Sequence, residues 1–116
     1  MKLEDVLWIS ITMHEFSIEI LAPAWHEIEE IADMHLSLVG PASAKKITDK
    51  ILNHIELLKD NPFIGTECEE IILRTDHYRK LFIGKYLCFY RIIGKTIYVY
   101  HVIDGKRNYP ILFESN

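Results

Sequence analysis

Three residues near the end of the chain combine side chains that transfer protons with one that binds phosphate: His101, Arg107 and Tyr109. A histidine exchanges its proton near neutral pH, and a tyrosine can donate a proton or stack on an unpaired base. An arginine presents a planar, always-charged fork to a phosphate. This set suits RNA cleavage without a metal, which needs a base, an acid and a cation on the phosphate in the transition state.

Four further basic residues would hold RNA or another target: Arg79, Lys80, Lys85 and Lys106. They fall in the same basic part of the chain as the three candidate catalytic residues. Lys85 follows a glycine at a predicted turn, so the alternative interpretation is a turn tip that is simply solvated.

The other candidate residues also have structural interpretations. His101 is expected to share a strand face with Ile97, Val99 and Ile103, so it is a packed histidine if that face meets the helices. Tyrosines of predicted strands are more often ordinary strand residues than a row for stacking bases. This second interpretation applies to Tyr86, Tyr90, Tyr98 and Tyr100.

The sequence contains no pattern that indicates a metal or another cofactor, and none is expected. His26 and His35 are nine residues apart, which is not a metal-binding spacing on a helix. Cys68 and Cys88 are expected to be two reduced thiols of a cytoplasmic protein. Neither a phosphate-binding glycine loop nor a serine nucleophile motif occurs.

The order of the elements follows from hydrophobic periodicity. Residues 16–20 alternate as a half-buried strand, and two amphipathic helices are predicted over 24–39 and 42–59. The first helix has a predicted apolar stripe of Trp25, Ile28, Ala32, His35, Leu36 and Val39, and its water-facing residues are Glu27, Glu29, Glu30 and Asp33. The second helix has the apolar stripe Ala44, Ile47, Ile51, Ile55 and Leu58.

Residues 78–113 are expected to form three strands, over about 78–83, 86–92 and 96–103. Gly84 and Gly94 each begin a tight turn, so the strands form an antiparallel meander. The predicted fold class is α+β with the order β-α-α-β-β-β: a small antiparallel sheet with a helical hairpin packed on one face.

The chain of 116 residues is predicted to hold one domain, residues 14–116, after an N-terminal extension, residues 1–13. The extension either precedes a natural start at Met13, adds an edge strand, or packs on a partner. Its sequence is too short and too acidic for a secretory signal, and no membrane span is expected.

The net charge of −4 conceals an uneven distribution. Residues 1–73 carry 14 acidic and 5 basic side chains, a net charge of −9, whereas residues 74–113 carry 8 basic and 2 acidic ones, a net charge of +6. The folded molecule is expected to have an acidic and a basic side, the latter suited to a polyanion or an acidic protein. The alternative is a solvated surface with local ion pairs.

Four segments, taken in order, carry a resemblance that covers residues 14–113. They are a strand with Pro23 leading into a helix rich in Glu and Ile, residues 59–65 (KDNPFIG), residues 78–91 (YRKLFIGKYLCFYR), and the strand that leads into residues 105–109 (GKRNY). In this order and spacing they resemble the RelE/ParE superfamily, the toxins of bacterial type II toxin–antitoxin modules, also called plasmid stabilisation proteins.

The resemblance implies the β-α-α-β-β-β fold and a cognate antitoxin that wraps the toxin in a hetero-oligomer. It also implies one of two activities. Some members enter the ribosome and cleave messenger RNA, and others inhibit DNA gyrase without being nucleases.

The tail departs from the usual family pattern. His101, Asp104 and Asn108 stand where an arginine, a histidine and an aspartate are common, and Phe113 stands where messenger-RNA-cleaving members have a tyrosine. The main hypothesis is a ribosome-dependent endoribonuclease that uses Arg107 on the phosphate and His101 or Tyr109 for proton transfer. The alternatives are a gyrase-binding toxin without nuclease activity, and a degenerate toxin that only binds its antitoxin.

Overall fold

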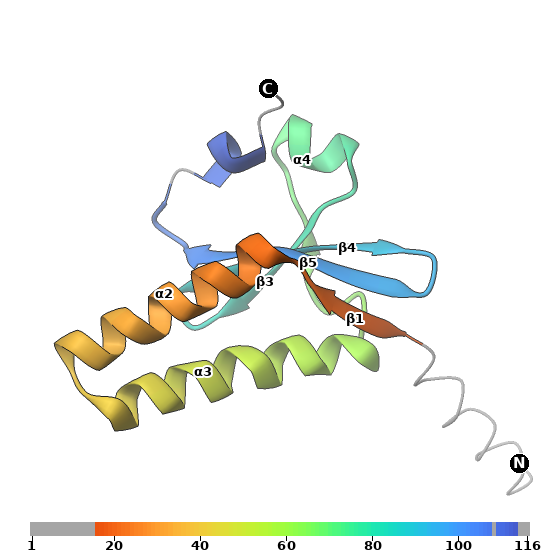
Figure 1. Cartoon of the computed structure of the whole chain (residues 1–116). Coiled ribbons are helices and arrows are strands. Elements are labelled where there is room, and N and C mark those ends of the chain that lie inside the picture. The colour runs from red at the N-terminus through yellow and green to blue at the C-terminus, as the bar shows by residue number, and fades with distance from the viewer. Residues whose placement is uncertain (1–15, 108, 114–116) are drawn as a thin grey trace, which may run out of the picture.

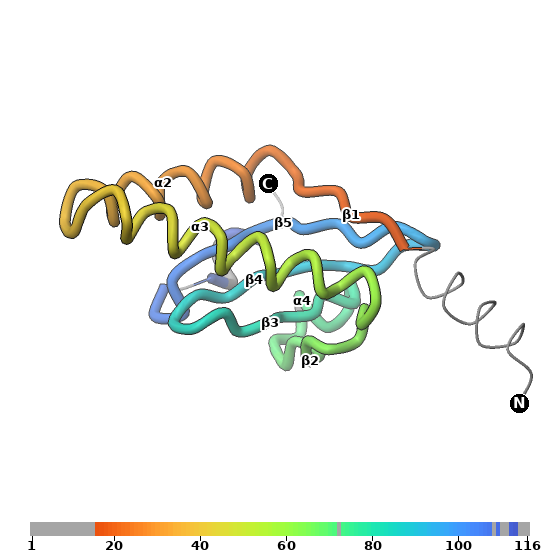
Figure 2. The backbone as a smooth tube through the Cα atoms, turned by 90° about the horizontal axis from the view of Figure 1, so that it is seen from below, coloured from red at the N-terminus to blue at the C-terminus, as the bar shows by residue number. Residues whose placement is uncertain are grey.

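A short strand and two long helices begin the part of the chain that the structure describes, residues 16–107 and 109–113. In this computed structural model, β1 (Ser17–Ile20) leads directly into α2 (Ala22–Leu38), and α3 (Pro41–Glu56) follows. The two helices lie side by side along one side of the sheet, as the sequence predicts (Figures 1 and 2).

The boundaries of the helices follow from proline and glycine. Pro23 lies in the first turn of α2 and Pro41 in the first turn of α3, where a missing N–H interrupts no helical hydrogen bond. Gly40, between the helices, has a φ of 141°, a conformation that residues with a side chain rarely adopt.

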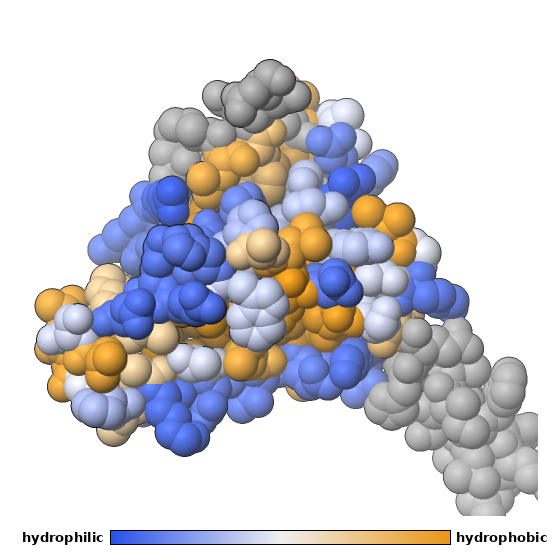
Figure 3. Space-filling model, in the orientation of Figure 1, coloured by the Kyte–Doolittle hydropathy of each residue, from blue (hydrophilic) through white to orange (hydrophobic). Residues whose placement is uncertain are grey.

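The buried face of α2 differs from the predicted stripe. Ala24, Ile28 and Ile31 are buried, while Trp25 and Val39 are 43% and 74% exposed. The helix is rotated relative to this prediction because it packs against both α3 and β5. The side chains left exposed form an apolar tip on the helical hairpin, visible in Figure 3: Met34, Leu36, Leu38 and Val39.

The predicted meander is confirmed. It consists of β3 (Arg79–Ile83), β4 (Tyr86–Ile93) and β5 (Thr96–Asp104). Gly84 and Gly94 have φ values of 59° and 61°, so each supplies the positive φ that the first position of these two-residue turns needs.

The sheet is mixed rather than wholly antiparallel. Its strand order is β1-β5-β4-β3-β2, and β1 pairs with β5 in parallel. The alternation of residues 16–20 indicates which side of β1 is buried, but it carries no information on strand direction. The sequence also did not predict β2 (Thr66–Glu67), a two-residue edge strand beside β3.

A β-bulge changes the alternation of β5. Phe89 pairs with His101, whereas the next residue of β4, Tyr90, pairs with Val99. Tyr100 is the extra residue, and the side chains beyond it change sides. The prediction that Ile97, Val99 and Ile103 share a face is therefore wrong, because Ile103 packs on the other side of the sheet.

Apolar side chains cover both faces of the sheet. The larger cluster lies under the helical hairpin and includes Ile28, Ile51, Ile55 and Tyr90. The smaller cluster lies on the opposite face, under α4 (Ile71–Thr75) and the 3-10 turn η2 (Tyr109–Phe113), neither of which was predicted. Its buried members are Cys68, Leu73, Tyr78, Leu87, Phe89 and Ile103.

The predicted boundary between residues 13 and 14 lies outside the described residues. Within the described part of the chain, no helix combines the length and the apolar character that crossing a membrane requires.

Candidate functional site

His101 lies on β5 beside the bulge and pairs with a carboxylate from α2. Its Nδ1 is 3.0 and 3.1 Å from the two oxygens of Glu27. Glu27 also accepts the backbone N–H of Val102 at 3.1 Å, so one carboxylate binds both the histidine and the strand edge. The side chains of His101 and Glu27 are only 16% and 13% exposed. The prediction that Glu27 faces water is wrong, since α2 lies against β5.

Tyr109 pairs with a different carboxylate, on the opposite side of the sheet. Its hydroxyl donates a hydrogen bond to Glu70, which directly precedes α4. This hydrogen bond, with burial and nearby acidic groups, raises the pKa of Tyr109 to about 12. Burial alone would raise the pKa of Glu70, but hydrogen bonds and the charge of Lys80 together lower it.

An aromatic cluster joins these two pairs. The ring of Phe113 lies 5.0 Å from that of His101 and 5.3 Å from that of Phe89, centre to centre. Phe89 in turn lies 4.9 Å from Tyr109. The two candidate proton-transfer groups therefore contact one cluster, but each is hydrogen-bonded to a carboxylate of its own.

Arg107 is exposed after the end of β5 and lines a groove of about 310 Å³ between α2 and the sheet. Glu27 and Glu30 line the same groove from α2. Arg107 therefore shares a groove with Glu27, the carboxylate to which His101 is hydrogen-bonded.

Asp104 organises the basic end of the sheet. Its side chain accepts the backbone N–H of Lys106 at 2.9 Å and lies 3.9 Å from the ammonium group of Lys85. The backbone N–H of Gly105 donates to the carbonyl of Lys85 at 2.8 Å, which attaches the β3–β4 turn to the tail. The structure therefore brings Lys85 and Lys106 together with Arg107 at this end.

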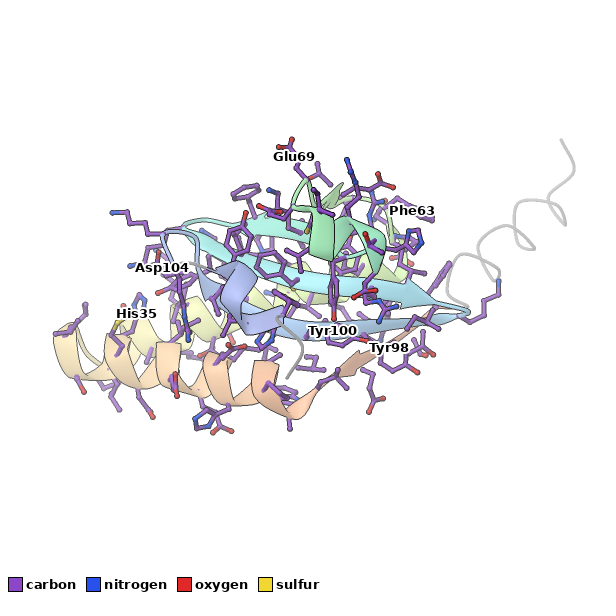
Figure 4. The ribbon with its side chains drawn as sticks, turned by 90° about the horizontal axis from the view of Figure 1, so that it is seen from above. His35, Phe63, Glu69, Tyr98, Tyr100 and Asp104 are labelled. Atoms are coloured by element: carbon purple, nitrogen blue, oxygen red, sulfur yellow. The ribbon has the colours of Figure 1, made fainter. Side chains whose placement is uncertain are left out.

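The predicted binding residue Arg79 is the first residue of β3, and its side chain binds the backbone of a neighbouring loop. Its guanidinium donates to the carbonyls of Phe63 and Gly65 at 3.2 and 2.5 Å, and it lies over the Phe63 ring. Figure 4 shows Phe63 and Asp104 at opposite ends of the sheet. Lys80 is half-buried on β3, close enough to Glu70 for its charge to act on that carboxyl.

The charges of the folded chain are partly mixed. Glu67 lies 3.7 Å from Arg79, and Asp104 lies beside Lys85. At these positions the structure favours local ion pairing over a purely basic side. The outer face of α2 remains acidic, because Glu29, Glu30 and Asp33 are all exposed.

Sequence reasoning missed one arginine of β4, which contacts two tyrosines of the smaller cluster. Arg91 lies between the rings of Tyr78 and Tyr100, at 5.3 and 5.9 Å from their centres. Local spacing does not indicate this contact, because Tyr100 lies on β5 and Tyr78 directly precedes β3.

The described residues contain no group of three or more His, Cys, Asp or Glu side chains arranged to hold a metal ion. What the arrangement offers is an exposed cationic end, a carboxylate-bound histidine beside it, and a carboxylate-bound tyrosine on the other face.

Comparison with known proteins gives three consistent results. The profile of a family described as the ParE toxin of the type II toxin–antitoxin system parDE matches residues 18–109. Toxin ParE1 of Mycobacterium tuberculosis, from strains CDC 1551 / Oshkosh and ATCC 25618 / H37Rv, is 35% identical over 89 residues, which cover 75% of this chain and 88% of the relative. A solved structure of a chromosomal ParDE system from P. aeruginosa has a TM-score of 0.66 at 21% identity, covering 78% of this chain and 97% of that one, and thus shows a shared fold.

Proposed function

We propose that this chain, which belongs to the family of ParE toxins of type II toxin–antitoxin systems, stops growth by binding DNA gyrase rather than by cutting messenger RNA. Family membership makes the chain the toxin component of such a module, with a cognate antitoxin as its partner. The finer question is how the toxin acts, and two features of its tail support a binding mode.

The observation that carries the proposal is the hydrogen bond that the candidate general acid, Tyr109, makes to a carboxylate inside the molecule. A general acid must release its proton near the operating pH, and a tyrosine with a pKa of about 12 is poorly suited to that role. The hydroxyl of Tyr109 already donates its proton to Glu70 in a hydrogen bond inside this chain. Phe113, at the position where messenger-RNA-cleaving relatives carry a tyrosine, packs against Tyr78 and Phe89 and has no proton to transfer.

Gyrase is the precedent for a target within the superfamily that the sequence resembles. A toxin that acts by binding needs an accessible surface and no reacting groups. The exposed tail around Lys106 and Arg107 is such a surface, and we expect it to contact the target.

Ribosome-dependent messenger-RNA cleavage remains the second candidate, and one observation favours it. Arg107 lines the groove into which Glu27 projects, and Glu27 is bonded to His101. A histidine oriented by a carboxylate is a common general base, and a nearby arginine would stabilise a phosphate.

An expression experiment separates the candidates. The lone chain is induced in a growing bacterium, and growth, plasmid supercoiling and the ends of an abundant message are followed together. We expect growth arrest and relaxed plasmids with intact messages. New cleavage ends inside the reading frame, lost in Arg107→Ala, would overturn the proposal in favour of the nuclease. Normal growth with ample soluble protein would instead indicate a degenerate toxin that only binds its antitoxin.

The matched control for Arg107→Ala is Lys46→Ala. Lys46 is an exposed basic residue that belongs to α3 and not to the tail. We expect Lys46→Ala to arrest growth as the wild type does, so that an effect of Arg107→Ala reports its position and not simply the loss of one positive charge.

A further inference from the structure

A groove of about 810 Å³ runs along the outer edge of the sheet, beside β1. β1 is the end strand of the sheet (Figure 1). Both long helices contribute to the groove, and six of its ten lining residues are apolar. Its apolar lining residues are Phe16, Ile18, Ile20, Trp25, Leu52 and Ile55.

The outer edge of β1 offers backbone hydrogen bonds. Ser17 and Leu21 donate their N–H groups inward, to the carbonyls of Lys95 and Val99 at 2.9 and 3.0 Å. Because successive residues of a strand point their N–H groups to opposite sides, those of Ile18 and Ile20 point outward. Among the described residues, β1 pairs only with β5. An open edge of this kind accepts a further strand.

The segment that precedes β1 has the composition of such a strand. Residues 7–11 (LWISI) are rich in residues that favour strands, and they alternate, with Leu7, Ile9 and Ile11 on one side and Trp8 and Ser10 on the other. Residues 1–15 lie outside the described part of the chain, which begins at Phe16, a residue that itself lines the groove.

We propose that residues 7–11 pair with β1 as an antiparallel sixth strand and fill this groove. A four-residue loop, residues 12–15, would join the two strands, a length common in hairpins. Leu7, Ile9 and Ile11 then lie opposite Ile20, Ile18 and Phe16 and cover Trp25, which is otherwise 43% exposed.

The register follows from the polarity of both strands. Ser17 and Glu19 are exposed, whereas Phe16, Ile18 and Ile20 are partly buried beside the larger core cluster. In the proposed register Ser10 lies opposite Ser17, and the three apolar residues of the segment all face the groove. A slip by one residue would turn all three away, so the pattern selects one register.

The chain's own segment is a better occupant than a second copy. It is tethered at the groove by four residues, which gives it a high effective concentration there. A second copy would have to reach the same edge by diffusion and would depend on protein concentration.

Hydrogen exchange of the full chain tests the proposal directly. We expect the amides of Ile18 and Ile20 to exchange about tenfold or more slower than unprotected amides, at every protein concentration. Ile9→Lys, which puts a charge into the groove, should abolish this protection. Ser10→Lys, on the opposite side of the strand, should leave it unchanged. Protected amides of Phe89 and Val99 in each variant show that the domain is folded.

Fluorescence gives a second measurement. The chain has two tryptophans, so Trp8→Phe leaves Trp25 as the only emitter. Its emission should shift to longer wavelength when Ile9→Lys is added, because Trp25 loses its cover. The proposal is overturned if Ile18 and Ile20 exchange freely in the wild type, if Ile9→Lys changes neither signal, or if protection requires a high protein concentration or added antitoxin.

Discussion

Glu27 is the residue on which the candidate site most depends, because it accepts hydrogen bonds from both His101 and the Val102 backbone. Replacing it by alanine leaves two partly buried donors without an acceptor. We expect Glu27→Ala to lower the free energy of unfolding by about 1–3 kcal/mol, measured by urea denaturation.

Glu30→Ala is the matched control. Glu30 lies three residues further along α2, is exposed, and pairs with His26 at the surface. Its replacement should change stability by no more than about 0.5 kcal/mol. Equal effects of the two variants would show that the Glu27 carboxylate does not hold the strand edge.

The Tyr109–Glu70 hydrogen bond should stabilise the fold only within a window of pH. The pKa of Tyr109 is raised from 10.0 to about 12, so above pH 10 the unfolded chain releases this proton first and stability falls as the pH rises. The pKa of Glu70 is lowered from 4.5, so its contribution is lost as the pH falls below that value.

We therefore expect the stability difference between the wild type and Tyr109→Phe to be largest between about pH 5 and 10 and to shrink on either side. Unfolding curves of both proteins at several pH values measure it. A difference that does not change with pH would contradict the pairing.

The sequence identified His101, Arg107 and Tyr109 but not the carboxylates that hold two of them. Glu27 is 74 residues from His101, and Glu70 is 39 residues from Tyr109. Local spacing cannot reveal such pairs, because they depend on how α2 and α4 lie against the sheet.

At the scale of elements, residues 62–67 are fastened to the sheet through Gly65. The hydroxyl of Tyr90 accepts the N–H of Gly65 at 2.9 Å and donates to the carbonyl of Pro62 at 2.8 Å. A Cβ at Gly65 would lie 2.6 Å from that hydroxyl and 2.7 Å from the carbonyl of Lys80. Because neither a backbone atom nor a buried ring moves easily, no side chain fits there.

Gly65→Ala should accordingly destabilise the protein by about 3 kcal/mol or more, since it both overpacks a buried site and breaks hydrogen bonds. The comparison is Gly94→Ala, where a Cβ meets nothing within 4 Å and only the positive φ opposes it, at about 1–2 kcal/mol. Thermal unfolding of both variants shows which loses more stability. A larger loss of stability for Gly94→Ala than for Gly65→Ala would contradict this prediction.

The elements that could be predicted are those with a long periodic pattern. The two helices and the meander were predicted from their periodicity and glycines, but the parallel pairing of β1 and the short elements β2 and α4 were not. A two-residue strand has no pattern to detect, and strand direction depends on where the chain returns. The bulge at Tyr100 similarly reversed the expected side of Ile103.

At the scale of the whole molecule, the basic residues divide into two groups with different roles. Arg79 binds carbonyls of the loop beside β2 and is 17% exposed, whereas Arg107 is exposed in the tail. We expect Arg79→Ala to lower the free energy of unfolding by about 1–3 kcal/mol, because it frees two carbonyls and a ring contact.

Arg107→Ala should instead weaken toxicity and leave the unfolding free energy within about 0.5 kcal/mol of the wild type. Unfolding curves and growth curves of both variants measure this. A stable but fully toxic Arg107→Ala variant would show that the tail does not belong to the surface that contacts the target.

The central claim is that the toxin acts by binding gyrase, and the most direct measurement is supercoiling of relaxed plasmid by purified gyrase with increasing amounts of the chain. We predict loss of supercoiling, its recovery on adding antitoxin, about tenfold weaker inhibition by Arg107→Ala, and unchanged inhibition by Lys46→Ala. Full supercoiling at saturating toxin, from a preparation that cuts messages in a translating extract, would contradict it.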